Sequence, residues 1–275
     1  MRLSPRLVCA AVLASTLFLS GAARAEDQDS IDYRRHIMAT LGEEAAAIGQ
    51  ILQKKAPADD LAVHAQILAV TAATAKKAFE PKAPGGEAKP GVWANWNDFA
   101  KRLDELTAAT ADLAKTAKEG GLAASAPKVE ALGCRSCHDT YREKSTAAAP
   151  SVKADDAVEY REHVMKSLNE QSAALGMILS TVIPEDGETA HMEAIALSAR
   201  IGLKAFEPKV PGGQAKPELW TNWPDFSKRM NDFARKTDEM ARLAQEKGPE
   251  AASGTIVEAL SCKSCHDLYR NENKK

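Results

Sequence analysis

The sequence predicts an all-α protein made of two tandem four-helix bundles. Three observations predict it: apolar residues recur at helical spacing, aromatic residues make up only 5% of the chain, and one long segment occurs twice. Alanine and charged residues are plentiful and runs of β-branched residues are few, which favours helices over strands. The formal net charge of −2 gives no indication of nucleic-acid binding.

The start of the chain differs from the rest and has the pattern of an export signal. Arg2 and Arg6 precede an apolar stretch at residues 7–19, and small residues flank Arg24 as they do at a cleavage site. We therefore expect cleavage after Ala25 and no membrane span in the mature chain. A retained anchor fits less well, because the apolar stretch is too short to cross a bilayer.

The rest of the chain contains two copies of one unit. The segment KAFEPKAPGGEAKPGVWANWNDFAKRLDE, which begins at Lys77, returns 127 residues later from Lys204 as KAFEPKVPGGQAKPELWTNWPDFSKRMND. YRRHIMATLGEEAAAIGQIL, which begins at Tyr33, returns at the same spacing from Tyr160 as YREHVMKSLNEQSAALGMIL. We expect a signal at 1–25, a first bundle at 26–144, a linker at 145–156 and a second bundle at 157–275.

Each copy is expected to form four helices, which in the first copy fall near residues 31–54, 59–79, 95–118 and 124–144. Ile37, Leu41 and Ile48 recur at helical spacing in the first of them. Pro57 followed by two aspartates is a helix start for the second, and leucines recur at helical spacing along the third. Residues 80–92 contain three prolines and three glycines, so they are expected to cross between the second and third helices without being helical.

Four of the five cysteines fall into two Cys-x-x-Cys-His motifs, one near the end of each copy. The motif residues are Cys134, Cys137 and His138 in the first copy and Cys262, Cys265 and His266 in the second. The fifth cysteine, Cys9, belongs to the export signal.

Three chemistries use a Cys-x-x-Cys pair, and two of them fit this chain poorly. A thioredoxin-like redox pair needs a βαβ context, and the pattern here is helical. Structural zinc needs four ligands, whereas each motif supplies three. A disulfide within the motif would close too small a loop to stabilise a bundle and would leave both histidines unexplained.

The third chemistry is covalent haem attachment, and it uses every residue of the motif. Two cysteines three residues apart share a helix face and can form thioethers with the two haem vinyl groups, while the adjacent histidine reaches the iron. The four motif cysteines are therefore predicted attachment points, and His138 and His266 are predicted proximal ligands.

A Cys-x-x-Cys-His near the C-terminal end of a four-helix bundle resembles the class II c-type cytochromes, the cytochrome c′ family. The resemblance extends to DTYR or DLYR after each motif, to KPGVW or KPELW, and to YRRHIM or YREHVM. It covers both copies and leaves out the signal and linker. It implies two covalently attached haem c groups, where the usual member has one. It also implies a helix contact between the copies, since family members dimerise through their first two helices and the duplication would replace that dimer internally.

Members of this family differ in what lies opposite the proximal histidine. Low-spin members have a methionine of the first helix as sixth iron ligand, and high-spin members leave that side open. The family position falls on Met38 and Met165, so the resemblance implies that they are distal ligands. The alternative is that each methionine only fills core volume, as methionine readily does, which leaves a five-coordinate iron open to NO or CO.

Two pairs of arginines are expected near the haem groups. Arg34 and Arg161 lie one helical turn before the two methionines, where each can pair with a haem propionate. Arg142 and Arg270 lie one turn after the proximal histidines, and the resemblance implies that they approach the same haem edge and tune the ligand.

The remaining histidines are expected to be structural. His36 and His163 have polar neighbours on the first helix of each copy, which predicts that they are solvated. His64 and His191 lie on apolar stripes, which predicts buried, hydrogen-bonded side chains. A haem with two histidine ligands is the remaining alternative for the second pair.

The sequence thus predicts a periplasmic dihaem electron carrier without enzymatic activity. An axial thioether stabilises ferrous iron and raises the reduction potential. Redox proteins of the periplasm or the membrane are the expected electron donor and acceptor, with no nucleic-acid partner. The alternative function is a high-spin module that binds NO or CO.

Overall fold

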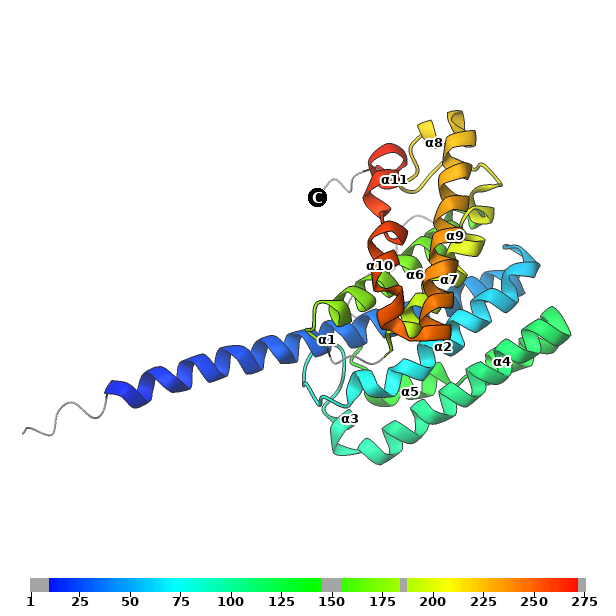
Figure 1. The fold of residues 1–275 in the computed structure, drawn as a ribbon. Helices are drawn as coiled ribbons and strands as arrows, with labels where there is room; N and C mark the ends of the chain where they lie inside the picture. Colours follow the sequence, from blue (N-terminus) through cyan, green and yellow to red (C-terminus); the bar gives the residue numbers. More distant parts are fainter. Residues whose placement is uncertain (1–9, 145–154, 184–186, 272–275) are drawn as a thin grey trace, which may run out of the picture.

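The computed structural model describes the backbone of residues 10–144, 155–183 and 187–271, with side chains from residue 27 onward. The predicted export signal and nearly all of the predicted linker lie outside the residues whose side chains are described. The described chain is helical, and only isolated bridges join its extended segments (Figure 1). Within these residues no helix has the length and apolar character that crossing a bilayer requires. The predicted all-α class is confirmed.

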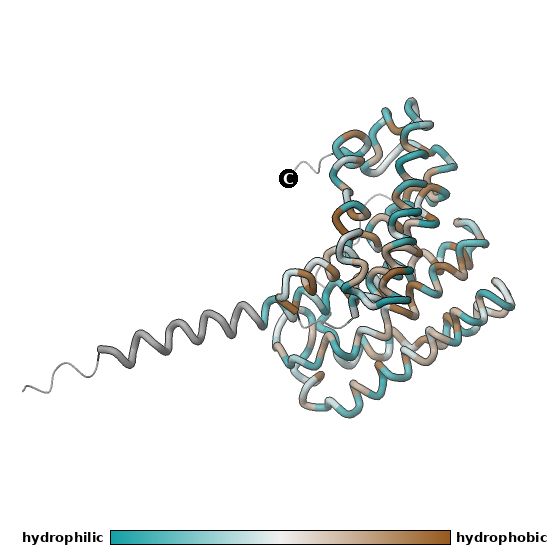
Figure 2. The backbone as a smooth tube through the Cα atoms, in the orientation of Figure 1, coloured by the Kyte–Doolittle hydropathy of each residue, from teal (hydrophilic) through white to brown (hydrophobic). Residues whose placement is uncertain are grey.

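Both copies have the same order of elements, with one exception. The first copy contains α1 (Ala10–Leu52), α2 (Leu61–Phe79), α3 (Gly91–Ala94), α4 (Trp96–Glu130) and α5 (Cys134–Tyr141). The second copy contains α6 (Asp156–Leu179), α7 (Glu188–Gly202), α8 (Glu218–Thr221), α9 (Trp223–Lys247), α10 (Pro249–Ala259) and α11 (Cys262–Tyr269). The exception is that α4 of the first copy runs across a kink at Gly121 and corresponds to the two helices α9 and α10 of the second. Figure 2 shows hydrophobic and hydrophilic residues alternating along these helices, as amphipathic helices around a core require.

The helices begin and end where local chemistry dictates. Pro57 precedes a 3₁₀ turn at Ala58–Asp60 that leads into α2. Asp155 caps α6, because its side chain accepts a hydrogen bond from the backbone N–H of Ala157 at 2.9 Å. Between the third and fourth helices the chain reverses at Gly121 (φ 64°) in the first copy and at Gly248 (φ 88°) in the second. Both are positive-φ positions that glycine adopts without strain.

The predicted fourth helix, at 124–144, is divided in two, and this corrects its expected extent. In the first copy α4 ends at Glu130, and Gly133, with φ 70°, precedes α5. In the second copy α10 ends at Ala259 and α11 begins at Cys262. Each cysteine motif therefore stands on a separate helix of eight residues, and α11 lies beside α8 in Figure 1.

The crossover segment holds the end of the cysteine-bearing helix. It is not helical from Glu80 to Pro90, as predicted, but the short helix α3 begins at Gly91, inside the segment that was expected to be non-helical throughout. The backbone N–H of Lys89 donates to the carbonyl of Tyr141 at 2.9 Å, and the N–H of Glu143 donates to the carbonyl of Glu87 at 2.8 Å. The second copy repeats both bonds through Lys216, Tyr269, Asn271 and Gln214. The crossover therefore fixes the C-terminal end of each cysteine helix.

The two copies share their cores. Helix α1 packs against α6, and α2 packs against α7, so the expected helix contact between copies is present. One buried cluster contains Ile37 and Phe79 of the first copy together with Ile178 of the second. Another contains Ala47 of the first copy among residues of the second, such as Val164. Each core is therefore completed by the other copy.

Candidate functional site

The cysteine motifs lie at the surface, on α5 and α11. On α5, Cys134 and His138 are exposed and Cys137 is half-buried. The second copy repeats this pattern with Cys262, Cys265 and His266. One helix thus presents two thiols and an imidazole within five consecutive residues in each copy.

The motif side chains are exposed or half-buried, and partial burial by neighbouring protein shifts their pKa values. Burial raises the pKa of the thiols of Cys134 and Cys137. Burial lowers the pKa of His138, and the positive charge of Arg142 lowers it further. The same directions and leading cause hold for Cys262, Cys265 and His266. A thiol and a neutral imidazole are the states that thioether formation and iron ligation need, so this donor set fits a haem c group.

The other two uses of a Cys-x-x-Cys pair find no support in the geometry. All four motif cysteines are free thiols, with no disulfide between them. Among the described residues no three His, Cys, Asp or Glu side chains gather as a metal site.

The methionines predicted as distal iron ligands pack against the same apolar clusters as the second cysteine of each motif. Met38 of α1 is partly buried and packs against the cluster that Cys137 also contacts. In the second copy, Met165 of α6 and Cys265 likewise both pack against one buried cluster. The predicted distal and attachment residues of each copy thus border one apolar core.

Arg34 and Arg161 have partners other than the predicted propionates. Arg34 is only 4% exposed, and its two terminal nitrogens donate to the carbonyls of Ala83 and Gly85, each at 2.6 Å. Its guanidinium also lies over the ring of Phe79. Arg161 makes the corresponding bonds to the second crossover. Both arginines hold the crossover segments because these contain carbonyls with no helical partner.

Arg142 and Arg270 lie one helical turn after the predicted proximal histidines, and their approach to a haem edge stays a prediction. Both are exposed and follow directly after the cysteine helices, and the backbone N–H of each donates to the carbonyl of its proximal histidine at 3.0 Å. The charge of Arg142 acts on His138, and the charge of Arg270 acts on His266.

A tyrosine anchor that the sequence reasoning missed fixes each cysteine helix on the bundle. The hydroxyl of Tyr141 donates to Asp98 at 2.6 Å, and Arg102 donates to the same carboxylate oxygen at 2.7 Å. Tyr269, Asp225 and Arg229 repeat the arrangement. The sequence contains a pattern that could have indicated this anchor. An Asp-Phe-x-Lys-Arg segment occurs in both copies, with its aspartate and arginine one helical turn apart.

His36 and His163 are not solvated, which corrects their predicted role. His36 contacts Glu170 of the other copy at 2.6 Å, and His163 contacts Glu43 at 2.5 Å. Their side chains are 24% and 14% exposed. The polar face of α1 meets the polar face of α6, so these histidines form cross-copy pairs.

His64 and His191 are buried and hydrogen-bonded, as predicted, with each only 1% exposed. The ring nitrogens of His64 contact Glu44 at 2.7 Å and the hydroxyl of Tyr160 at 2.9 Å. The ring of His191 contacts the hydroxyl of Tyr33 at 2.9 Å and also bonds Gln171. Because both nitrogens of each ring are engaged, neither histidine is available to an iron, and the arrangement with two histidine ligands is wrong.

The neutral His191 makes the protein sensitive to acid. Burial, followed by the charge of His36, lowers the pKa of His191 to about 4. The unfolded chain takes up this proton near pH 6.5 and the folded chain does not, so stability falls as the pH drops from 6.5 towards 4. The expected loss is about 3 kcal/mol over that window. Urea unfolding between pH 4.5 and 7 should give a shallower pH slope for His191→Gln, and equal slopes would contradict the assignment.

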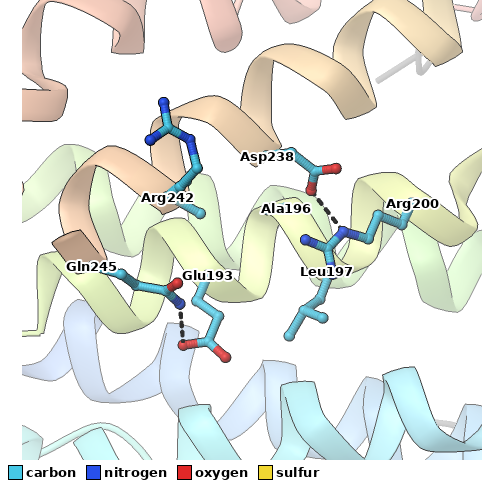
Figure 3. A pocket seen from close by; sticks show the side chains of 8 residues that line it. Glu193, Ala196, Leu197, Arg200, Asp238, Arg242 and Gln245 are labelled. Carbon is cyan, nitrogen blue, oxygen red and sulfur yellow. Dashed lines mark hydrogen bonds and ion pairs between the residues drawn. The ribbon is translucent and has the colours of Figure 1, made fainter.

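A separate surface pocket of about 390 Å³ lies between α7 and α9 (Figure 3). Four of its polar side chains bond in pairs: Arg200 pairs with Asp238 at 2.7 Å, and Gln245 donates to Glu193 at 3.0 Å. None of its lining residues belongs to α10 or α11. The pocket is therefore separate from the cysteine motif of its copy.

Comparison with known proteins gives the same family for both copies. The family model described as Cytochrome C' matches residues 29–142 and again residues 156–270. A cytochrome c′ of Rubrivivax gelatinosus is 32% identical over 124 residues, which covers 42% of this chain and 95% of the relative. A cytochrome c-556 of Agrobacterium fabrum is 32% identical over 120 residues, covering 42% of this chain and 81% of the relative.

Among solved structures, the chain is similar to the cytochrome c prime from Shewanella frigidimarina. The identity is 22%, and the match covers 42% of this chain and 95% of that one, with a TM-score of 0.39. The two relatives compared by sequence each cover 42% of this chain, as expected when one unit occurs twice. With two matched copies, two cysteine motifs and helical bundles around shared cores, the chain belongs to the cytochrome c′ family as a tandem two-domain member.

Proposed function

We propose that the protein is a periplasmic electron carrier that holds one haem c in each copy, with each iron ligated by a histidine and a methionine. The observation that carries the proposal is the shared cluster in each copy. Met38 and Cys137 border one apolar core, and Met165 and Cys265 border the other. A macrocycle held by the cysteine helix would thus lie towards the helix that carries the methionine.

The chain's own residues would hold and orient the cofactor. Cys134 and Cys137 would attach it through thioethers, with His138 as the proximal ligand, and the second motif would do the same on α11. When bound, haem supplies an iron that takes up and releases one electron. Met38 and Met165 would favour the ferrous form through their thioether sulfurs. The hydrogen bonds from Tyr141 to Asp98 and from Tyr269 to Asp225 would fix the position of each cysteine helix on its bundle.

Exposure of the motifs supports electron exchange with other proteins. Because α5 and α11 lie at the surface, an attached haem would have an edge within reach of a redox partner. The export signal supports a periplasmic location, and we propose periplasmic or membrane redox proteins as donor and acceptor. The limits of the two copies, at 26–144 and 157–275, remain part of this proposal.

The spectrum of the reduced protein tests the ligation. We expect sharp, resolved low-spin bands that do not change when CO is added. Met38→Leu and Met165→Leu should each convert about half of this signal to a broad high-spin spectrum that shifts with CO, since each copy loses a distal ligand. Met177→Leu is the matched control, because Met177 packs against the same cluster as Met38 without being at the ligand position.

A broad high-spin spectrum of the unaltered protein would overturn the proposed ligation. Shifted bands on addition of CO would then assign the alternative function, a five-coordinate haem protein that binds small gases such as NO and CO.

A further inference from the structure

We infer that the two haem sites are not equivalent, and that the charge of Glu87 makes the first site accept an electron less readily than the second. The inference rests on the proposed function, since it concerns residues beside the proximal histidines. It arises from one difference between the copies, at the side chain that faces the arginine after each cysteine helix.

In the first copy that arginine is neutralised. The guanidinium of Arg142 forms an ion pair with Glu87, with its Nε at 2.7 Å and its Nη2 at 2.6 Å from the same carboxylate oxygen. Glu87 lies on the crossover segment, which the pairing of Ala88 with Arg142 holds against the end of α5.

In the second copy the described residues give the arginine a neutral side-chain partner. The Nε of Arg270 donates to the side-chain oxygen of Gln214, which stands at the position of Glu87 and is a neutral amide. The backbone arrangement is unchanged, since Ala215 pairs with Arg270 as Ala88 pairs with Arg142. The two sites thus share their geometry and differ by one negative charge at this position.

This charge reaches the proximal histidine. At His138 the charges of Arg142 and Glu87 act in opposite directions on the pKa of the imidazole. At His266 the charge of Arg270 acts without an opposing charge from the crossover segment. An aspartate directly after each histidine, Asp139 or Asp267, acts in both copies and does not distinguish them.

The direction follows from charge. Ferric haem carries one positive charge more than ferrous haem, so a nearby cation favours the ferrous form and a neutralised one does not. Arg270 therefore raises the electron affinity of the second site, while Glu87 cancels this effect of Arg142 at the first. A reduced donor protein becomes oxidised when it gives up one electron, and that electron would reside on the second copy.

The size of the effect is limited by solvent. The side chains of Arg142 and Glu87 are 43% and 56% exposed, so salt screens their charges. We expect the charge to change the reduction equilibrium constant by up to about tenfold at low salt, which is 59 mV for a one-electron couple.

The test is a potentiometric titration of the two-haem protein at low salt, followed by haem absorbance. We expect two steps in the unaltered protein. Glu87→Gln should raise the lower of the two reduction potentials, by an amount that corresponds to about three- to tenfold in the reduction equilibrium constant. Gln214→Glu should lower the higher potential by a similar amount. Glu246→Gln is the control, because Glu246 pairs with Arg242 at the opposite end of α9 from α11 (Figure 1). All shifts should shrink at high salt.

Two results would overturn the inference. One is a titration in which Glu87→Gln and Gln214→Glu shift the two reduction potentials no more than Glu246→Gln does. The other is a shift of the upper step by Glu87→Gln. An intact mass recorded on each sample separates these results from failure of the proposed function, because a chain without two covalent haems fails the proposed function itself.

Discussion

Replacing Ile178 by alanine is expected to destabilise both copies, although the residue belongs to the second. Ile178 is 1% exposed and lies in the cluster that contains Tyr33, Ile37 and Phe79 of the first copy. Loss of a buried isoleucine side chain leaves a cavity, with an expected cost of about 2–5 kcal/mol in the free energy of unfolding. Because the cluster spans the copies, scanning calorimetry should show one cooperative transition, shifted as a whole.

The neighbouring residue provides the control. Leu179 is 46% exposed, so Leu179→Ala should change the free energy of unfolding by no more than about 0.5 kcal/mol. Two separate calorimetric transitions, of which Ile178→Ala moves only one, would show that the copies fold independently and would contradict the shared core.

The second large effect is expected for Arg34→Lys. The planar guanidinium of Arg34 donates to two crossover carbonyls from a buried position, a geometry that the single ammonium of lysine cannot reproduce. Hydrogen bonds from a charged group each contribute about 1.5–3 kcal/mol, so we expect a loss of about 2–4 kcal/mol in the free energy of unfolding. Urea unfolding of the purified variant measures it.

Arg35→Lys is the matched control for this substitution. The side chain of Arg35 is 63% exposed and pairs with Asp32 on the same helix, so its replacement should have little effect. If Arg34→Lys is no less stable than Arg35→Lys, Arg34 does not anchor the crossover segment.

The fold and the attachment motifs could be predicted because their signals are local or repeated. Helical spacing of apolar residues identified the first helix, and prolines and glycines marked the crossover segment. The Cys-x-x-Cys-His motif is contiguous, and its second copy removed the ambiguity of a single occurrence. The division before Cys134 was missed because a lone Gly133 is compatible with the end of a helix or with a continuous one.

Contacts between distant segments could not be predicted from one sequence. A polar helix face looks the same whether it meets water or another polar face, so His36 was expected in solvent and instead contacts Glu170, 134 residues away. The spacing of Arg34 from Met38 shows that they share a helix stripe but not that the guanidinium turns to crossover carbonyls. Such partners depend on how the two copies and the crossover pack.

The central claim is that each cysteine helix carries a haem, and the intact mass of the purified mature protein tests it most directly. We predict the mass of the chain from Glu26 onward plus two haem groups, with the additions retained after denaturation. Replacing both motif cysteines of one copy by serine should remove one addition and leave the other. A mass without covalent haem, or with two hydrogens lost per motif through disulfide formation, would contradict the account.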